Sequence, residues 1–408
     1  MIGASGIAEK IKASVPMLLL LVGMAIGFIP AMPKIEINPE IVMLLFLPPL
    51  LYDAAFNISF QEFKTNFNTI TTLGMGLVFV TTAGIALLVH YLIPGMGWPQ
   101  SFVLGAILSA TDAVAAIGVT KGLGLHPKTI TILEGESLIN DASALVAYHF
   151  AVAAVTGIAF VPWKAGLEFI WLLGGGVLIG AVVTKILGFV LRIFHSNDMV
   201  VISLMLLMPF VTYLIAEHFK VSGVIAVVIV GLGLARLSRN RFPNKLKEQS
   251  RNFWEVIIFM LNGLIFLLIG LQFPLILKKM PATQVWIYTA YAAAIVVAVL
   301  LIRMVRVYMQ QFTLTKAFLG RGGRRRQKRI SREALFDSKT SFIISWSGMR
   351  GIVSLAIALG LPEKLDNGQP FPMRNEIIFL AIAVVLFSLL GQGLSLPWIV
   401  RKFKSEEK

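Results

Sequence analysis

Long apolar segments separated by short polar connections run through the whole chain. Twelve of these segments have about the 20 residues that a helix needs to cross a bilayer. They fall at residues 14–32, 40–58, 69–93, 100–120, 129–158, 166–191, 198–216, 221–235, 253–277, 284–313, 340–361 and 376–400. The pattern predicts an all-α polytopic membrane protein with about twelve transmembrane helices.

Composition supports a membrane protein. Hydrophobic residues make up 57% of the chain and charged residues 14%, against roughly 45–50% and about 25% in soluble domains. The sequence contains no cysteine, which excludes disulfides and thiolate metal sites.

The net charge of the chain is +15. The positions of its basic residues indicate how the chain is oriented in the membrane. Of the 36 Lys and Arg residues, 25 fall in the two termini and the even-numbered connections, and seven in the odd-numbered ones. This bias predicts that both termini are cytoplasmic. The basic cytoplasmic loop 316–339, with GRGGRRRQKRISR, is predicted to contact anionic lipids and not nucleic acid.

Two consecutive predicted helices carry carboxylates near the middle of the membrane, where ionisable groups are rare and usually functional. Asp112 follows Ser109-Ala110-Thr111 in segment 100–120, and Asp141 lies in segment 129–158. The small and hydroxyl residues before Asp112 favour a local unwinding that frees backbone carbonyls. These features predict a site for a cation or a proton.

Residue spacing separates two faces of segment 129–158. Ser137 and Asp141 are four residues apart and share one face, whereas Glu136 and Asn140 share a neighbouring face. Glu136 lies about 140° around the helix from Asp141. Glu136 therefore needs its own partner.

The predicted partner of Glu136 is Arg350, which lies between Gly348 and Gly351 in segment 340–361. Glycines on both sides predict a broken helix there. Arg303, near the end of segment 284–313, is expected to extend towards the cytoplasm.

Three further features concern the second segment and the middle of the chain. Pro48 and Pro49 are expected to break segment 40–58 just before Asp53. Asp53 is either an interfacial residue or a carboxylate lining the ion's route. Glycine-rich segments 166–235 are expected to contact a second copy in a homodimer.

Five motifs now point to a family. SATDAVA, GESLINDA, FLPPLLYDAAF, FWEVIIFMLNGLIFLLIG and WSGMRGIVSLAIAL together resemble the bacterial sodium/proton antiporters of the monovalent cation/proton antiporter superfamily, in its electroneutral Asn-Asp branch. The resemblance covers nearly the whole chain. It implies a secondary transporter of the cell inner membrane with a role in pH homeostasis, not an enzyme, and no cofactor.

The resemblance also implies roles for individual residues. The predicted ion-binding and transport positions are Asp141, Asp112, Ser137, Thr111 and Asn140. Na⁺ would bind at the first four, Glu136 and Arg350 would form a structural ion pair, and Asp53 would face the ion funnel.

The implied architecture is a single antiporter domain over residues 1–408, built of inverted repeats in which broken helices 4 and 11 cross. The ion-binding core would comprise residues 100–158 and 340–400. The scaffold and dimerisation helices would comprise residues 14–58 and 166–277. Relatives commonly have one more helix before the first and continue beyond Lys408 into a soluble tail.

The expected activity is exchange of Na⁺, and possibly Li⁺, for protons by alternating access. Asn140 stands where the electrogenic branch carries an additional aspartate, which implies one cation for one proton. A K⁺/H⁺ antiporter of the same fold is the main alternative, and a passive cation channel is another. An intramembrane aspartyl protease is disfavoured because Tyr52-Asp53 has no accompanying Gly-x-Gly-Asp motif.

Overall fold

A computed structural model describes residues 15–29, 38–58, 67–120, 127–156, 162–193, 197–319, 338–365 and 368–405. This part of the chain is helical apart from turns, short links and one isolated β-bridge between Lys364 and Pro370. Residues 1–14 and most of the predicted basic loop 316–339 lie outside the described residues.

Each predicted segment corresponds to a helix or to a pair of shorter helices. In chain order these are α2 (Val15–Gly27), α3 (Pro39–Asn57), α5 (Phe67–Leu92), α6 (Trp98–Ser109), α7 (Ala113–Thr120), α8 (Pro127–Val155), α9 (Pro162–Ile193), α10 (Asp198–His218), α11 (Gly223–Arg241), α12 (Asn244–Lys279), α13 (Ala282–Leu319), α15 (Ser338–Trp346), α16 (Ile352–Leu359) and α17 (Arg374–Ser405).

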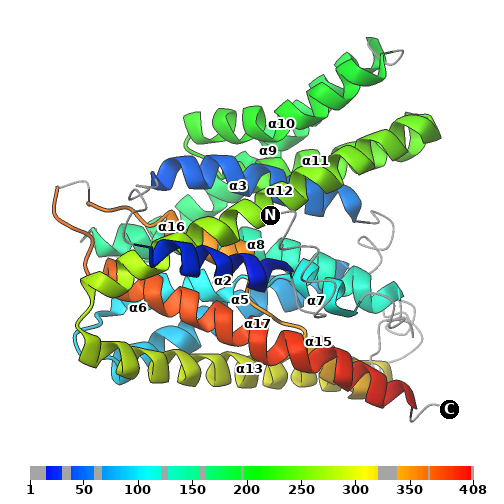
Figure 1. The fold of residues 1–408 in the computed structure, drawn as a ribbon. Helices are drawn as coiled ribbons and strands as arrows, with labels where there is room; N and C mark the ends of the chain where they lie inside the picture. Colours follow the sequence, from blue (N-terminus) through cyan, green and yellow to red (C-terminus); the bar gives the residue numbers. More distant parts are fainter. Residues whose placement is uncertain are drawn as a thin grey trace.

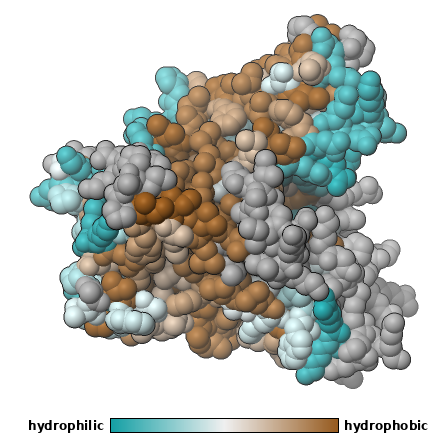
Figure 2. Space-filling model, in the orientation of Figure 1, coloured by the Kyte–Doolittle hydropathy of each residue, from teal (hydrophilic) through white to brown (hydrophobic). Residues whose placement is uncertain are grey.

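The protein is a multi-pass membrane protein. Within the described residues, eight helices are long and apolar enough to cross a bilayer: α3, α5, α8, α9, α10, α12, α13 and α17. Figure 2 shows a continuous hydrophobic band over the visible face, with hydrophilic residues gathered towards its edges. Large side chains such as Ile170, 66% exposed, and Trp286, 80% exposed, lie on the outside, as lipid contact requires.

The helices lie side by side with their axes in broadly similar directions (Figure 1). Helices α9, α10 and α11 gather on one side with α3, and α13 and α17 on the other, with α8 between the two groups. Helix α2 packs along α12. Their backbones approach closely, since a Cβ at Gly23 would meet the Leu267 carbonyl and one at Gly270 would meet that of Leu20.

Two sequence predictions about individual helices are wrong: the break in segment 40–58 and the position of Arg303 near a helix end. Helix α3 runs without interruption through Pro48 and Pro49 to Asn57, because neighbouring groups can satisfy backbone atoms that a proline frees inside a membrane protein. Helix α13 is 38 residues long, longer than the apolar run that predicted it. Arg303 therefore lies ~24 Å along the helix from its C-terminal end.

The remaining predicted segments include two that are interrupted. Helix α6 ends at Ser109 and α7 begins at Ala113. Helix α15 ends at Trp346 and α16 begins at Ile352. Both interruptions coincide with the small and polar residues from which the sequence predicts them. Residues of both interruptions line the candidate site described below.

Candidate functional site

The two interruptions are in direct contact with each other. The Asp112 backbone N–H donates to the Met349 carbonyl at 2.8 Å. The Ser354 hydroxyl at the start of α16 donates to the Ala110 carbonyl at 3.3 Å. Backbone groups that a broken helix leaves without partners are thus partly satisfied by the other broken helix.

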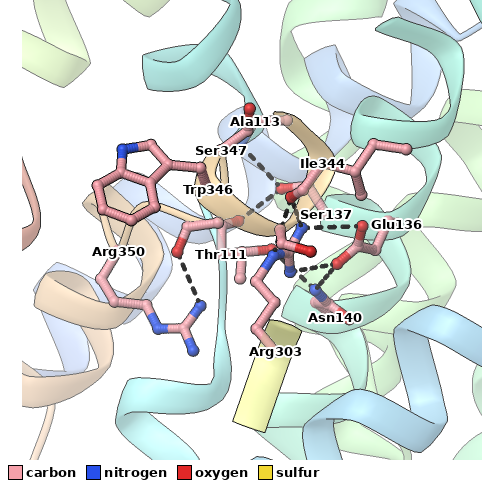
Figure 3. Close-up of polar contacts among 12 residues, drawn as sticks. Thr111, Ala113, Glu136, Ser137, Asn140, Arg303, Ile344, Trp346, Ser347 and Arg350 are labelled. Carbon is pink, nitrogen blue, oxygen red and sulfur yellow. Dashed lines mark hydrogen bonds and ion pairs between the residues drawn. The ribbon is translucent and has the colours of Figure 1, made fainter. Parts of the chain in front are cut away.

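Helix α8 supplies further partners to the α6–α7 interruption. The Ser137 hydroxyl donates to the Thr111 carbonyl at 2.6 Å and accepts from the Ala113 N–H at 3.3 Å. One turn along, the Asn140 amide donates to the Thr111 hydroxyl at 2.8 Å. These side chains converge in Figure 3. Ser137 and Asn140 hold the interruption against α8.

Asp141 is the buried carboxylate of the site. It is 6% exposed, and its Oδ1 has no hydrogen-bond partner within the described residues. A buried carboxylate oxygen is strongly unfavourable unless something binds it. A proton or a cation bound at Asp141 would therefore relieve the cost of burying its charge.

A cleft brings Asp141 together with polar groups from four other helical segments. Its polar lining consists of Asp53, Thr111, Asp112, Ser137, Asp141, Asn262 and Ser354. Gly351 also lines it, and a Cβ at that position would overlap the Asp112 carboxylate. The glycine makes room for the acid.

The predicted ion pair between Glu136 and Arg350 is wrong, because Glu136 pairs with Arg303 of α13. Two guanidinium nitrogens of Arg303 donate to the Glu136 carboxylate, the Nη2 bond to Oε2 being 3.0 Å. Both residues are only 1% exposed. The Glu136–Arg303 pair also contacts Asn140, whose amide lies 3.3 Å from Glu136 Oε1.

Arg303 also binds the end of α15. Its Nε and Nη2 each donate to the Ile344 carbonyl at 3.1 Å. A Cβ at Gly348 would collide with the Arg303 side chain. The pair thus connects α8, α13 and α15 (Figure 3), and Gly348 leaves the space that Arg303 occupies.

Arg350 has a different environment from the one predicted. Its Nη1 donates to the Gly348 carbonyl at 3.2 Å, whereas its Nε and Nη2 have no hydrogen-bond partner within the described residues. It is 1% exposed, and in Figure 3 its guanidinium lies apart from Glu136.

Comparison with known proteins identifies the family of this chain. The family model for the transmembrane sodium/hydrogen exchanger matches residues 1–402. The chain belongs to the sodium/hydrogen exchanger family. This makes the protein a secondary transporter and not an enzyme, and its cleft is a candidate transport site.

Individual relatives support the same family. The exchanger is 34% identical to the Na⁺/H⁺ exchanger YjcE of Escherichia coli, over 98% of this chain and 74% of that protein. It is 33% identical to the sodium, potassium, lithium and rubidium/H⁺ antiporter of Bacillus pumilus, over 98% and 60%. The solved antiporter MjNhaP1 of Methanocaldococcus jannaschii has the same fold, with a TM-score of 0.72, 21% identity and 96% coverage of both chains.

The exchanger's cleft includes four of the five predicted ion-binding and transport residues. Asn140 is absent from its lining and directs its amide towards Thr111 and Glu136. The separation of α8 into two faces agrees with this arrangement, since Ser137 and Asp141 line the cleft.

Two cleft residues come from the opposite wall. Asp53 of α3 accepts from the Asn57 amide at 2.9 Å. Asn262 of α12 lines the cleft, and its Oδ1 has no partner among the described residues. The sequence singles out Asn262 only as a polar residue within an apolar span, because its place in the cleft depends on how α12 packs.

Proposed function

We propose that Asp141 binds either a monovalent cation or a proton, and that the exchanger transports the two in opposite directions by alternating access. The observation that carries this proposal is the buried, unpartnered Oδ1 of Asp141 in a cleft at two helix interruptions. Transporters commonly place coupling ions at such discontinuous helices.

The proposed cation ligands are oxygens, which suit hard cations. Asp141 and Asp112 provide carboxylates, Ser137 a hydroxyl, and Thr111 the adjacent polar backbone. A proton on Asp141 and a cation beside it each reduce the charge that must be buried. The unloaded carboxylate carries the full penalty of burial, which disfavours movement of the empty carrier.

The proposed stoichiometry is one cation for one proton, as in the Asn-Asp branch. Asn140 is uncharged, and Glu136 is neutralised by Arg303. Neither residue offers a second exchangeable proton. Transport in proteoliposomes should then be insensitive to a membrane potential set with an ionophore.

The proposed architecture has twelve spans. The eight long helices are joined by α2, α11 and the interrupted pairs α6–α7 and α15–α16, with the two pairs crossing as equivalent parts of inverted repeats. Cytoplasmic termini and a homodimer complete the proposal.

The proposed division into moving core and scaffold agrees with the cleft's two walls. On one wall, the lining residues of the α6–α7 interruption, of α8 and of 351–354 belong to the proposed core 100–158 and 340–400: Ala110, Thr111, Asp112, Ser137, Asp141, Gly351, Ile352, Val353 and Ser354. Asp53, Ile258 and Asn262 belong to the proposed scaffold 14–58 and 166–277. A cleft at this boundary can open to one side of the membrane or the other as the core moves.

Na⁺ is the proposed substrate, with Li⁺ and K⁺ as alternatives because oxygen ligands suit all three. Proton flux in proteoliposomes should be measured with Na⁺, Li⁺, K⁺ and Rb⁺ added in turn. Asp141→Asn should abolish exchange with every cation while the protein remains folded. Exchange near the wild-type rate in this variant would refute the assignment, and cation flux without proton counterflow would indicate a channel.

A further inference from the structure

Helix α17 contributes two buried polar side chains to the α15–α16 interruption. Ser388 and Gln392 are 2% and 4% exposed. They lie four residues apart, so they share one face of α17. Both face a stretch of backbone that has lost its own helical partners.

The two side chains join the opposite sides of the interruption. Gln392 Nε2 donates to the carbonyl of Trp346, the last residue of α15, at 3.0 Å. The Arg350 N–H, shortly before α16, donates to the Ser388 hydroxyl at 3.1 Å. Ser388 in turn donates to Gln392 Oε1. We call this connection the α17 clamp.

The backbone between the two residues that the α17 clamp binds is in contact with the cleft. Met349 lies between Trp346 and Arg350, and its carbonyl accepts the Asp112 N–H at 2.8 Å. Gly351, next to Arg350, leaves the space that the Asp112 carboxylate occupies. The position of Asp112 therefore depends on the backbone that the α17 clamp holds.

We propose that Ser388 and Gln392 are positioning residues of the exchanger, which hold the α15–α16 interruption so that Asp112 keeps its place beside Asp141. This inference rests on the proposed cation site in the cleft. Neither side chain lines the cleft, so both act through the backbone and not as ligands.

The test separates positioning from general helix packing. Polar contacts between membrane helices also stabilise a fold, but packing alone does not determine cation affinity. Ser388→Ala removes the hydroxyl, and Ser388→Thr retains it. Ser395→Ala is the matched control, because Ser395 lies on the same helix. Within the described residues, its hydroxyl accepts from the Trp346 indole at 2.9 Å and donates to the Gly391 carbonyl of α17, and does not bind the interrupted backbone.

Cation-driven proton flux of the full chain should be measured in proteoliposomes over a range of Na⁺ concentrations. Ser388→Ala and Gln392→Met should each raise the apparent KM for Na⁺ about tenfold, as expected for loss of one hydrogen bond to a buried backbone group, with Vmax within about twofold of wild type. Ser388→Thr and Ser395→Ala should retain the wild-type KM.

Two results would overturn the inference. One is a Ser388→Ala variant with lowered thermal stability and an unchanged KM, and the other is a Ser395→Ala variant with the same KM increase. If Gln392→Met fails to fold, the Ala and Thr variants of Ser388 still decide the question. The proposed function is tested separately, by flux in the wild type and its loss in Asp141→Asn.

Discussion

Replacement of either member of the Glu136–Arg303 pair should destabilise the exchanger. Removing one partner of a buried ion pair typically costs ~3–5 kcal/mol, because the survivor stays charged and unpaired. The two single variants should lose different amounts of stability. After Glu136→Gln, Arg303 keeps its two bonds to the Ile344 carbonyl. After Arg303→Met, the one hydrogen bond left to the Glu136 carboxylate within the described residues is that from the Asn140 amide, at 3.3 Å.

We therefore expect Arg303→Met to lie near the upper end of that range and Glu136→Gln near the lower end. The double variant removes both charges of the pair, so its destabilisation should fall short of the sum by ~2–3 kcal/mol. Unfolding of the detergent-purified variants, followed by tryptophan fluorescence against denaturant, measures this coupling energy.

Arg350 provides the matched control for this cycle. It is as buried as Arg303, but within the described residues its guanidinium donates to the Gly348 carbonyl and not to Glu136. Glu136→Gln and Arg350→Met should therefore couple less strongly than Glu136→Gln and Arg303→Met. The reasoning fails if Glu136→Gln leaves stability unchanged but shifts the apparent affinity for Na⁺, since Glu136 would then belong to the ion site.

Three further predictions concern the cleft. Gly351→Ala should displace the Asp112 carboxylate at ~1–3 kcal/mol of strain and strongly reduce Na⁺-driven flux, whereas Gly391→Ala, with open space at its Cβ, should transport like wild type. Asn262→Leu should raise the apparent KM for Na⁺ severalfold by removing a cleft oxygen, and an unchanged KM would exclude Asn262 from the ion's route. Asp53→Asn should reduce flux mainly at low Na⁺ and low ionic strength, because a lining carboxylate attracts cations over a distance that salt shortens; equal loss at high salt would contradict this.

The sequence predicts the parts of the site that depend on local chemistry. Small and hydroxyl residues before Asp112, and glycines around Arg350, indicate the two interruptions because such residues weaken a helix wherever it packs. Spacing along α8 separates the cleft face of Asp141 from the face of Glu136 because helical geometry is local.

The sequence does not identify contacts between distant elements. Two buried arginines could each neutralise Glu136, and the choice of Arg303 depends on α13 extending well beyond its apolar run. The roles of Ser388 and Gln392 likewise require knowing which face of α17 meets the interruption. Hydropathy alone indicates that these are polar residues in an apolar span.

The hydroxyl of Ser137 has a consequence for coupling that follows from counting its single hydrogen and two lone pairs. The hydrogen points to the Thr111 carbonyl, and one lone pair receives the Ala113 N–H. What remains is one lone pair, which can ligate a cation. In this arrangement Ser137 has no hydrogen left to solvate a bare Asp141 carboxylate. At the proposed cation site, the direction of one O–H bond would thus favour the cation-loaded state over the empty one, and would thereby oppose leakage by the unloaded carrier.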